Sequence, residues 1–448
     1  MALRQSVQHT EPMPMTTGHV EGLSNDGRGI ARINSKTVFI EGGLPGENVE
    51  FQIIRRHREY DEARIHNIHK SSAQRVQPKC RHYGVCGGCV LQHLSPDAQL
   101  AAKQKSLLDN LKRIGRVQPQ AILAPLIGSI WGYRRRARLS VHRAYSHADV
   151  HVGFVEKHSK HITDILRCET LHPKIGLIIQ PLAALIAALS INDRIPQIEV
   201  AVSESATVLV LRILAQPETS DRIKLFEFAQ AHDVHFYLQP GNEDSSVPLV
   251  GERIQLSYSL RRWDLQINYG PSDFIQVNAE INQQLVWHAL QELQVEPQQR
   301  VLDLFCGLGN FTLPLAKIAG EVVGVEGVNG LVARARANAA YNSLTNVHFY
   351  QGDLFKDQSH AVWLRQAYSR LLLDPPRAGA REILACLGSK LPPRIVYISC
   401  HPATLARDAN YLVNERNYKL LSAGIVDMFP HTAHVESMAV FACDGSQK

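Results

Sequence analysis

The first part of the chain consists of short runs in which apolar and polar residues alternate, a pattern typical of half-buried β-strands. The clearest runs lie at residues 37–40, 49–54 and 62–68, and turn sequences rich in Gly, Asn and Pro separate them. We expect five strands between residues 16 and 70, which suit a small barrel of the oligonucleotide-binding kind. This pattern predicts a first domain at residues 12–70.

A different pattern begins after this barrel, where apolar residues recur with helical spacing. Residues 94–113 predict a helix that starts at Pro96 and has Ser95 as its N-cap. Mixed strand and helix patterns continue from residue 132 to residue 269. We therefore predict a second, mixed α+β domain at residues 71–270, whose helix near residues 95–114 packs on the domain that follows.

The last third of the chain alternates between strongly apolar runs and helical segments. The runs that predict strands lie at residues 301–305, 321–325, 347–350, 371–374 and 395–399. Such alternation predicts right-handed crossovers and a mostly parallel, doubly wound sheet. A closing hairpin is expected from residues 418–427 and 436–442. We place this third, Rossmann-like α/β domain at residues 271–448.

Composition and charge add modest limits to this picture. The 448 residues carry 48 Lys and Arg against 42 Asp and Glu, giving a net charge of +6 and a pI near 8.8. This excess permits a polyanionic partner without demanding one. Basic clusters at residues 55–58, 134–138 and 261–262 could face phosphates or simply remain solvated. Residues 1–22 lack the apolar core of an export signal, and the most apolar stretch, 175–191, is interrupted, so we expect a cytoplasmic protein with no membrane span.

Eight cysteines in a chain expected to stay in the cytoplasm point to metal binding or catalysis rather than to disulfides. Cys80, Cys86 and Cys89 form a tight triplet, and the glycines among them would let the backbone wrap an ion. A fourth ligand is needed, and Cys168 is the candidate. Four thiolates fit zinc or a [4Fe–4S] cluster. The lack of a second C-x2-C pair favours iron–sulfur, with a redox pair at Cys86 and Cys89 as the remaining alternative.

A glycine-containing loop follows the first strand of the third domain and opens a helix. Gly307 and Gly309 would let the backbone turn tightly beside a ligand. Thr312, however, stands where a dinucleotide site would have its third glycine. Glu326 ends the next strand, where a carboxylate can accept hydrogen bonds from both ribose hydroxyls. These features favour S-adenosylmethionine over NAD and over a glycine turn without a ligand, and Asp353 after the third strand could bound the adenine.

Two later strand ends carry side chains with chemical potential. Cys400 follows one predicted strand and Asp374 ends its neighbour, at the edge of the sheet where α/β proteins bind their ligands. Cys400 could be a buried structural cysteine or a nucleophile that adds to C6 of a pyrimidine, so that C5 can attack a methyl group. Glu436 is then the candidate base for the C5 proton, with His431 and His434 as rivals, and Asp374 would position the donor. A paired base would have to be flipped out to reach such a site.

Together with the predicted barrel and the cysteines, these residues resemble the motifs of a known family. The chain resembles the bacterial RNA (uracil-5-)-methyltransferases, specifically the 23S rRNA members that have an N-terminal TRAM domain and an iron–sulfur cluster. The similarity runs nearly from end to end. The matching motifs are residues 45–47, the cysteine triplet, and residues 132–134, 274–278, 302–311, 374–379, 399–400 and 435–437.

The resemblance implies a role for each of these residues. The cluster ligands would be Cys80, Cys86, Cys89 and Cys168. The contacts to S-adenosylmethionine would come from Gln276, Phe305, Asn310, Glu326, Asp353 and Asp374, with Cys400 as the nucleophile and Glu436 as the base. The implied partner is 23S rRNA, at uracil(1939), and the implied protein is a cytoplasmic monomer whose TRAM barrel binds RNA. Two departures are His401 and Ala433, where the family usually has Asn and Gly.

Two other functions are compatible with parts of this pattern. A tRNA uracil-C5 methyltransferase would share the chemistry, but such relatives typically lack both the barrel and the cysteine triplet. An RNA-binding assembly factor would share the fold without catalysis. The presence of Cys400, Asp374 and Glu436 together argues against that second alternative.

Overall fold

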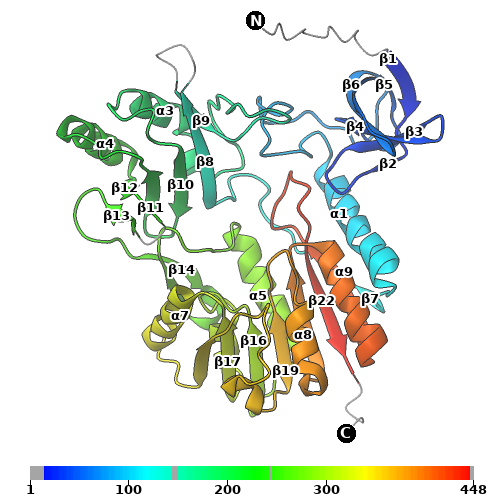
Figure 1. Cartoon of the computed structure of the whole chain (residues 1–448), viewed down its shortest axis with the longest axis vertical. Helices are drawn as coiled ribbons and strands as arrows, with labels where there is room; N and C mark the ends of the chain where they lie inside the picture. Colours follow the sequence, from blue (N-terminus) through cyan, green and yellow to red (C-terminus); the bar gives the residue numbers. More distant parts are fainter. Residues whose placement is uncertain (1–14, 144–149, 243–244, 444–448) are drawn as a thin grey trace, which may run out of the picture. The chain divides into compact units, whose positions relative to one another are not determined.

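The computed structural model of the chain describes residues 15–143, 150–242 and 245–443. The chain divides into two compact units, each with its own core (Figure 1). The first unit comprises residues 1–84, 89–102 and 431–433, and the second comprises residues 85–88, 103–430 and 434–448. No helix among the described residues is long and apolar enough to cross a membrane. The three domains expected from the sequence stay a prediction, and residues 12–14 and 444–448 of that division lie outside the described ranges.

The first unit is built on a six-stranded sheet with the order β1-β5-β6-β4-β3-β2. Its core contains the fully buried side chains of Val20, Ile40 and Phe51. Instead of the five strands expected, the described residues form six, one of which is only two residues long and pairs with the strand that follows it. The strands are β1 (Met15–His19), β2 (Gly22–Leu23), β3 (Gly29–Ile33), β4 (Lys36–Glu41), β5 (Asn48–Arg56) and β6 (Tyr60–Lys70).

A buried ion pair ties this β-rich domain to the chain that follows it. The Arg75 guanidinium donates to both carboxylate oxygens of Glu47, at 2.7 and 2.8 Å. The backbone N–H groups of Leu44 and Ser72 also donate to that carboxylate, at 2.9 and 3.1 Å. Burial opposes ionisation of Glu47, but these four hydrogen bonds outweigh it and the pKa lies below its usual value.

The predicted long helix is present at nearly the expected bounds, and its last turn is π-helical. It comprises α1 (Pro96–Asn110) and a π-helical turn at Leu111–Gly115. Within the second unit, this turn packs on α9 (Pro402–Asn410), and the Asn410 side chain donates to the Gly115 carbonyl at 2.8 Å. A Cβ on Gly115 would lie 2.8 Å from the Ala406 carbonyl oxygen, so the close approach of the two helices requires glycine.

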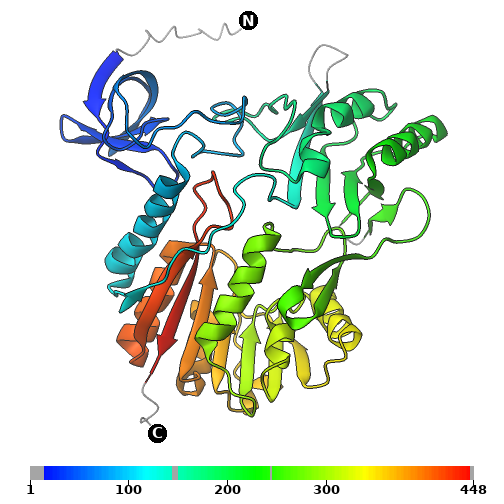
Figure 2. The same ribbon diagram turned by 180° about the vertical axis from the view of Figure 1, so that it is seen from behind.

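The middle of the second unit is a six-stranded sheet with the order β13-β12-β11-β10-β8-β9. Helices α3 and α4 lie on one of its faces (Figure 2), where Leu182 and Leu225 pack with Ile198 and Leu209. The strands are β8 (Arg136–Arg143), β9 (Val150–Gly153), β10 (Gln197–Val202), β11 (Thr207–Arg212), β12 (His235–Gln239) and β13 (Val247–Pro248). The helices are α2 (Pro173–Gly176), α3 (Ile179–Ala187) and α4 (Thr219–His232).

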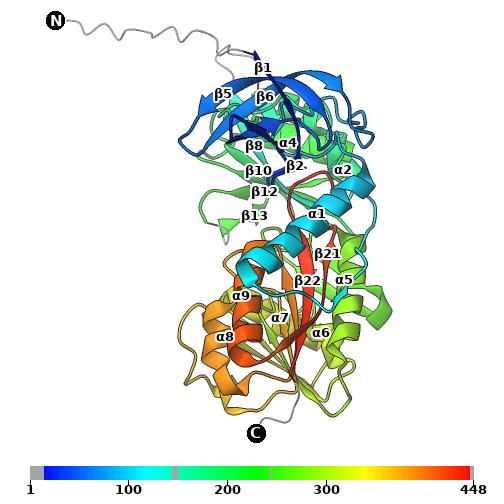
Figure 3. The ribbon, with the colours of Figure 1, turned by 90° about the vertical axis from the view of Figure 1, so that its right-hand side faces the viewer.

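The rest of the second unit is a doubly wound α/β fold, as predicted. Its eight-stranded sheet has the order β18-β17-β16-β19-β20-β22-β21-β7, with helices on both faces (Figure 3). The strands are β7 (Ala121–Ile122), β16 (Arg300–Leu304), β17 (Glu321–Glu326), β18 (Val347–Gln351), β19 (Arg370–Leu373), β20 (Arg394–Ser399), β21 (Lys419–Val426) and β22 (Glu436–Ala442). The helices are α5 (Ala279–Leu293), α6 (Thr312–Ala316), α7 (Asn329–Tyr341), α8 (Arg381–Leu387) and α9, and a separate hairpin joins β14 (Leu256–Leu260) to β15 (Leu265–Tyr269).

Strands β16 to β20 run parallel, whereas β22 is antiparallel to both of its neighbours. Strand β16 is followed in sequence by β17 on one side of it, whereas β19 lies on the other side. The connections therefore leave the sheet in opposite directions on either side of β16. This reversal point is where open α/β sheets bind their ligands, outside the carboxyl ends of the strands.

Candidate active site

Four predicted site residues lie at the carboxyl edge of the parallel strands. The register pairs Leu304 of β16 with Val325 of β17 and with Leu373 of β19. Phe305 and Asp374 therefore follow neighbouring strands at the same level, beside Glu326 at the end of β17. Cys400 directly follows β20, which pairs with β19 in the same direction. The sequence pattern predicted this common edge.

The loop after β16 is held by hydrogen bonds to the neighbouring strand. Glu326 accepts from the backbone N–H groups of Gly307 at 3.1 Å and of Val328 at 2.9 Å. Gly307 has a φ of 53°, and a Cβ added there would meet no atom within 4 Å, so the loop faces open space on that side. Phe305 has a φ of 64°, a conformation that costs a bulky residue energy and often marks a functional site.

Thr312 has a specific partner, which explains why the glycine pattern is incomplete. Its hydroxyl donates to the carboxyl group of Asp303 at 2.5 Å, inside the sheet. Burial raises the pKa of Asp303 to about 8, so this carboxyl group is protonated near neutral pH. A glycine at position 312 would leave that group without this hydrogen bond. The sequence showed both residues but carried no signal that they pair.

Two residues that the sequence did not indicate hold Asn310. The Tyr258 hydroxyl and the Asn282 amide both donate to Asn310 Oδ1 at 2.9 Å, and Asn310 Nδ2 donates back to Asn282 at 2.9 Å. Asn282 lies in the first turns of α5, and Asn278 caps that helix. Gln276, which only the resemblance indicated, is half-buried two residues before this cap.

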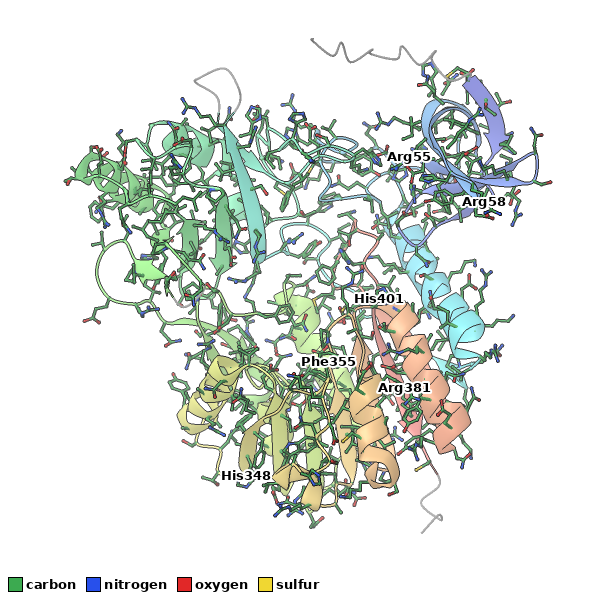
Figure 4. The ribbon with its side chains drawn as sticks, in the orientation of Figure 1. Arg55, Arg58, His348, Phe355, Arg381 and His401 are labelled. Carbon is green, nitrogen blue, oxygen red and sulfur yellow. The ribbon has the colours of Figure 1, made fainter. Side chains whose placement is uncertain are left out.

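Asp353 differs from the other predicted contacts because its side chain is exposed. It forms an ion pair with Lys356 at 2.9 Å and accepts from the Phe355 backbone at 3.2 Å, and these hydrogen bonds lower its pKa. The Phe355 ring lies 5.8 Å from the Phe305 ring. Figure 4 places Phe355 toward the same edge of the sheet as His401, with His348 near the opposite edge. Phe355 was missed because a lone exposed aromatic residue has no distinctive sequence pattern.

Cys400 and Glu436 come together through the antiparallel pairing of β20 and β22. Ser399 pairs with Ser437, so Cys400, which follows β20, and Glu436, which begins β22, lie at the same end of the two strands. Burial, and then the carboxyl groups of Glu436 and Asp374, raise the pKa of the Cys400 thiol to about 11. Burial alone raises the pKa of Asp374 to about 7, and burial together with Asp374 raises that of Glu436 well above its usual value. The three acidic groups thus sit close enough to influence one another's ionisation.

The two histidines proposed as rival bases lie in different units. His431 belongs to the first unit, where its backbone N–H donates to the Gln99 side chain at 2.9 Å. His434 belongs to the second unit, and its ring lies 5.4 Å from that of Phe429. Glu436, the third candidate base, is one of the groups that raise the pKa of the Cys400 thiol.

The four cysteines predicted to bind a metal are present as thiols, and each is half-buried. Cys86 Sγ accepts a hydrogen bond from the Gly88 backbone at 3.4 Å, and Cys168 Sγ lies 3.3 Å from the Thr170 hydroxyl. Such sulfur hydrogen bonds suit thiolate ligands. However, the residues described form no group of three or more His, Cys, Asp or Glu side chains that could hold a metal ion. Cys80 and Cys89 belong to the first unit and Cys86 and Cys168 to the second. Four thiols are donors that suit zinc or an iron–sulfur cluster.

The model of the tRNA (Uracil-5-)-methyltransferase family matches residues 95–442. The chain belongs to this family. The TRAM domain model matches residues 19–65, within the β-rich part of the first unit. Both matches confirm the resemblance inferred from the sequence motifs and the Rossmann-like fold expected for the third domain.

Named relatives and a solved structure agree with this membership. The 23S rRNA (uracil(1939)-C(5))-methyltransferase RlmD of Xanthomonas campestris pv. campestris is 52% identical over 425 residues, covering 94% of this chain and 96% of the relative. The enzyme of the same name from Stenotrophomonas maltophilia is 51% identical over 422 residues, covering 94% of this chain and 95% of the relative. The Pyrococcus abyssi tRNA (uracil-54, C5)-methyltransferase, solved with S-adenosyl-L-homocysteine, has a TM-score of 0.72 at 25% identity and covers 95% of this chain and 99% of that chain.

Proposed function

We propose that this chain methylates C5 of a uracil in 23S rRNA with S-adenosylmethionine as the methyl donor. The observation that most directly supports this proposal is the pairing of Ser399 with Ser437. This pairing brings the Cys400 thiol and the buried Glu436 carboxyl to neighbouring strand ends. C5 of uracil is a weak nucleophile, so its methylation needs covalent activation at C6 and removal of the C5 proton. A thiol beside an acid–base group meets both needs.

The proposed reaction uses these two groups in turn. Cys400 gives its thiol proton to water, and its sulfur forms a bond to C6, which moves the electrons of the C5–C6 double bond toward C5 and the O4 carbonyl. S-adenosylmethionine supplies an electrophilic methyl group. C5 bonds to that methyl carbon as the methyl–sulfur bond breaks and its electron pair stays on the donor sulfur. Glu436 then takes the C5 proton, the double bond re-forms, and Cys400 leaves as a thiolate.

The acidic character of the site supports a cationic methyl donor. Asp374, Glu436 and Cys400 have raised pKa values, so a nearby positive charge would favour their ionised forms. Glu326, fixed by two backbone amides, keeps lone pairs for ribose hydroxyls. The open space before Gly307 leaves room for a ligand at that loop. The residues that we assign to the donor are Gln276, Phe305, Asn310, Glu326, Asp353 and Asp374.

The choice of RNA rests on the relatives. Proteins named for uracil(1939) of 23S rRNA are 50–52% identical over 94% of the chain, which favours that uridine. Exposed Arg55 and Arg56 at the end of β5, with Arg58 in the turn that follows, add positive charge to the TRAM domain, where Figure 4 marks Arg55 and Arg58. A tRNA uracil is the second candidate, because the solved structure at 25% identity is named for tRNA. We further infer that the protein is a monomer that acts in the cytoplasm, which light scattering and cell fractionation would test.

Methylation of defined transcripts tests the proposed function. Wild-type protein should transfer labelled methyl groups to 23S rRNA containing the target uridine, and not to tRNA. Cys400→Ala should abolish transfer while S-adenosylmethionine still binds by calorimetry. Cys386→Ala, at a half-buried thiol outside the site, should retain activity. Full activity of Cys400→Ala would contradict the mechanism, and exclusive methylation of tRNA would establish the second candidate.

We also propose that Cys80, Cys86, Cys89 and Cys168 hold a [4Fe–4S] cluster. Their thiol state, their partial burial and the Gly88 hydrogen bond to Cys86 support this assignment. Protein purified without oxygen should be brown and contain about four irons per chain, and Cys168→Ser should lose that iron. Colourless protein containing zinc, or iron unaffected by the substitution, would contradict the assignment.

A further inference from the structure

The turn that carries Cys400 joins the end of β20 to the start of α9. On the strand side, the Ser437 hydroxyl donates to the Ser399 carbonyl at 3.1 Å, and the His401 backbone donates to the Ser399 hydroxyl at 3.1 Å. Ser437 is fully buried in β22. These contacts fix the residues before and after Cys400 to the sheet.

On the helix side, the turn depends on the side chain of His401. His401 is the N-cap of α9, with extended backbone angles, and its Nδ1 accepts from the Thr404 backbone N–H at 3.4 Å. Pro402 occupies the first helical position, where its missing N–H costs nothing. An N-cap side chain satisfies a helix N–H that would otherwise lack a partner inside the helix. His401 thus links the backbone of the nucleophile to the first turn of the helix.

An imidazole can cap a helix only while the capping nitrogen has a lone pair. Nδ1 must therefore be unprotonated, and a neutral ring then carries its proton on Nε2. Burial, followed by the charge of Arg377 on the loop after β19, lowers the pKa of His401 and favours this neutral form. On α9, the Arg407 guanidinium donates hydrogen bonds to the neighbouring Asp408 carboxylate and to the Ala378 carbonyl.

We propose that His401 is a positioning residue, whose neutral ring caps α9 and thereby fixes the turn that presents the Cys400 thiol. The proposal rests on the function proposed above, because it concerns the same nucleophile. It also accounts for the departure from Asn at this position. Asn is among the preferred N-caps, and its side-chain oxygen accepts the same backbone hydrogen bond.

The test compares His401→Ala and His401→Asn in steady-state methylation of 23S rRNA. We expect His401→Ala to lower kcat by 10-fold or more, while the KM values for RNA and S-adenosylmethionine change less than about threefold, as expected for a misplaced nucleophile. His401→Asn should recover kcat to within about threefold of wild type, because it restores the cap. The yield of covalent RNA adduct should follow kcat in both variants.

The chain contains a matched control for the loss of a histidine cap. His172 precedes Pro173 and caps α2, and its Nδ1 accepts from the Lys174 backbone N–H at 3.4 Å, one residue nearer to the cap than the residue that donates to His401. His172→Ala should change kcat by less than about twofold, since it removes a similar cap away from Cys400. Thermal unfolding of all the variants would show whether each remains folded at the assay temperature.

Three outcomes would overturn the inference. They are wild-type kcat in His401→Ala, no recovery in His401→Asn, or a protonated Nδ1 in the His401 signal of selectively ¹⁵N-labelled protein, identified by its loss in His401→Asn. Cys400→Ala distinguishes this failure from a failure of the proposed function. If Cys400→Ala is inactive while His401→Ala is fully active, only the positioning role is wrong. If Cys400→Ala remains active, the proposed function itself is wrong.

Discussion

Two buried glutamates, one in each unit, have carboxyl groups whose pKa values are shifted in opposite directions. Glu47 of the first unit receives two hydrogen bonds from Arg75 and two from backbone amides, and its pKa is lowered. Glu436 of the second unit is equally enclosed, but burial and the nearby Asp374 raise its pKa. No cation offsets those influences among the residues described. The surroundings of Glu47 favour its ionised form, whereas those of Glu436 favour its protonated form.

This difference separates a structural residue from the residue that we propose as the base. A satisfied buried charge contributes to the fold and has no capacity left for a ligand. An unsatisfied one costs stability, and proteins retain such groups mainly at functional sites. The same substitution, Glu to Gln, should therefore have opposite consequences at the two positions.

The largest effect is expected from Glu436→Gln on turnover. An amide cannot accept the C5 proton, so we expect turnover to fall by about 10³-fold, within the range for loss of a general base. The Cys400 adduct should accumulate, because methylation can proceed and elimination cannot. Denaturing gels of the variant incubated with RNA and S-adenosylmethionine would show a slowly migrating band.

The folded state should tolerate this change. Removing an acid that burial disfavours should leave the unfolding temperature at pH 8 unchanged or raised. A variant that turns over normally, or that is inactive without an adduct, would show that Glu436 is not the base.

The matched change in the first unit, Glu47→Gln, should act on stability instead. The amide retains the size of the side chain but leaves the Arg75 guanidinium without its anion, and breaking such a pair costs about 3 kcal/mol. Chemical denaturation should show this loss in the transition of the TRAM domain. The kcat of folded protein, measured at saturating RNA, should stay within about twofold of wild type. A kcat that falls with unchanged stability would reverse the comparison.

Local sequence patterns predicted which strand ends share an edge of the sheet, but they did not predict which distant residues pair there. Apolar runs and their alternation with helices placed Phe305, Asp374 and Cys400 at one edge, because parallel strands end together. The partnership of Cys400 with Glu436 depends on an antiparallel register, which no local pattern specifies. Glu436 was proposed from its place at the start of the last strand, whereas only the resemblance to a family indicated Gln276.

Long-range hydrogen bonds were the part that sequence patterns could not reveal. Arg75 lies 28 positions from Glu47, and Tyr258 lies 52 positions from Asn310. Polar pairing of this kind leaves no periodic signal, because each partner alone resembles an ordinary surface residue. The capping role of His401 was also hidden, since histidine is not a preferred N-cap.

A smaller effect is expected from Asp374→Asn on the pH dependence of stability. Burial raises the pKa of Asp374 from 3.8 to about 7, so the folded state resists an ionisation that the unfolded chain undergoes freely. The resulting penalty is absent below the unfolded value and grows as the pH rises, until it is complete above the folded value. Asn carries no such penalty. We expect the variant to be more stable than wild type by about 2 kcal/mol at pH 8 and by less at pH 5.

Denaturation curves at the two pH values would measure this difference, and the variant should also lose methyl transfer. Gln99→Leu would not serve as a control, because it removes hydrogen bonds. The control is Asp109→Asn, which changes a partly exposed acid in α1. That control should show little dependence on pH. A variant less stable than wild type at pH 8 would mean that Asp374 is stabilised by its surroundings, as Glu47 is.

The smallest expected effect concerns the backbone conformation of Phe305, compared with that of a hairpin in the first unit. In the hairpin between β3 and β4 of the first unit, positive φ values fall on Asn34 and Ser35, where such residues are ordinary. In the second unit, Phe305 adopts a φ of 64° beside the glycine loop. Comparing Phe305→Gly with Phe305→Ala removes the ring in both variants, so the difference between them reports the backbone cost alone.

At this position the Gly variant should be more stable than the Ala variant by about 1 kcal/mol, because only Gly adopts positive φ freely. Both Phe305 variants should weaken binding of S-adenosylmethionine in calorimetry if the ring contacts the donor. Equal stability of the two Phe305 variants would mean that the loop relaxes without strain, and the site would then differ from the first unit in its charges but not in its backbone.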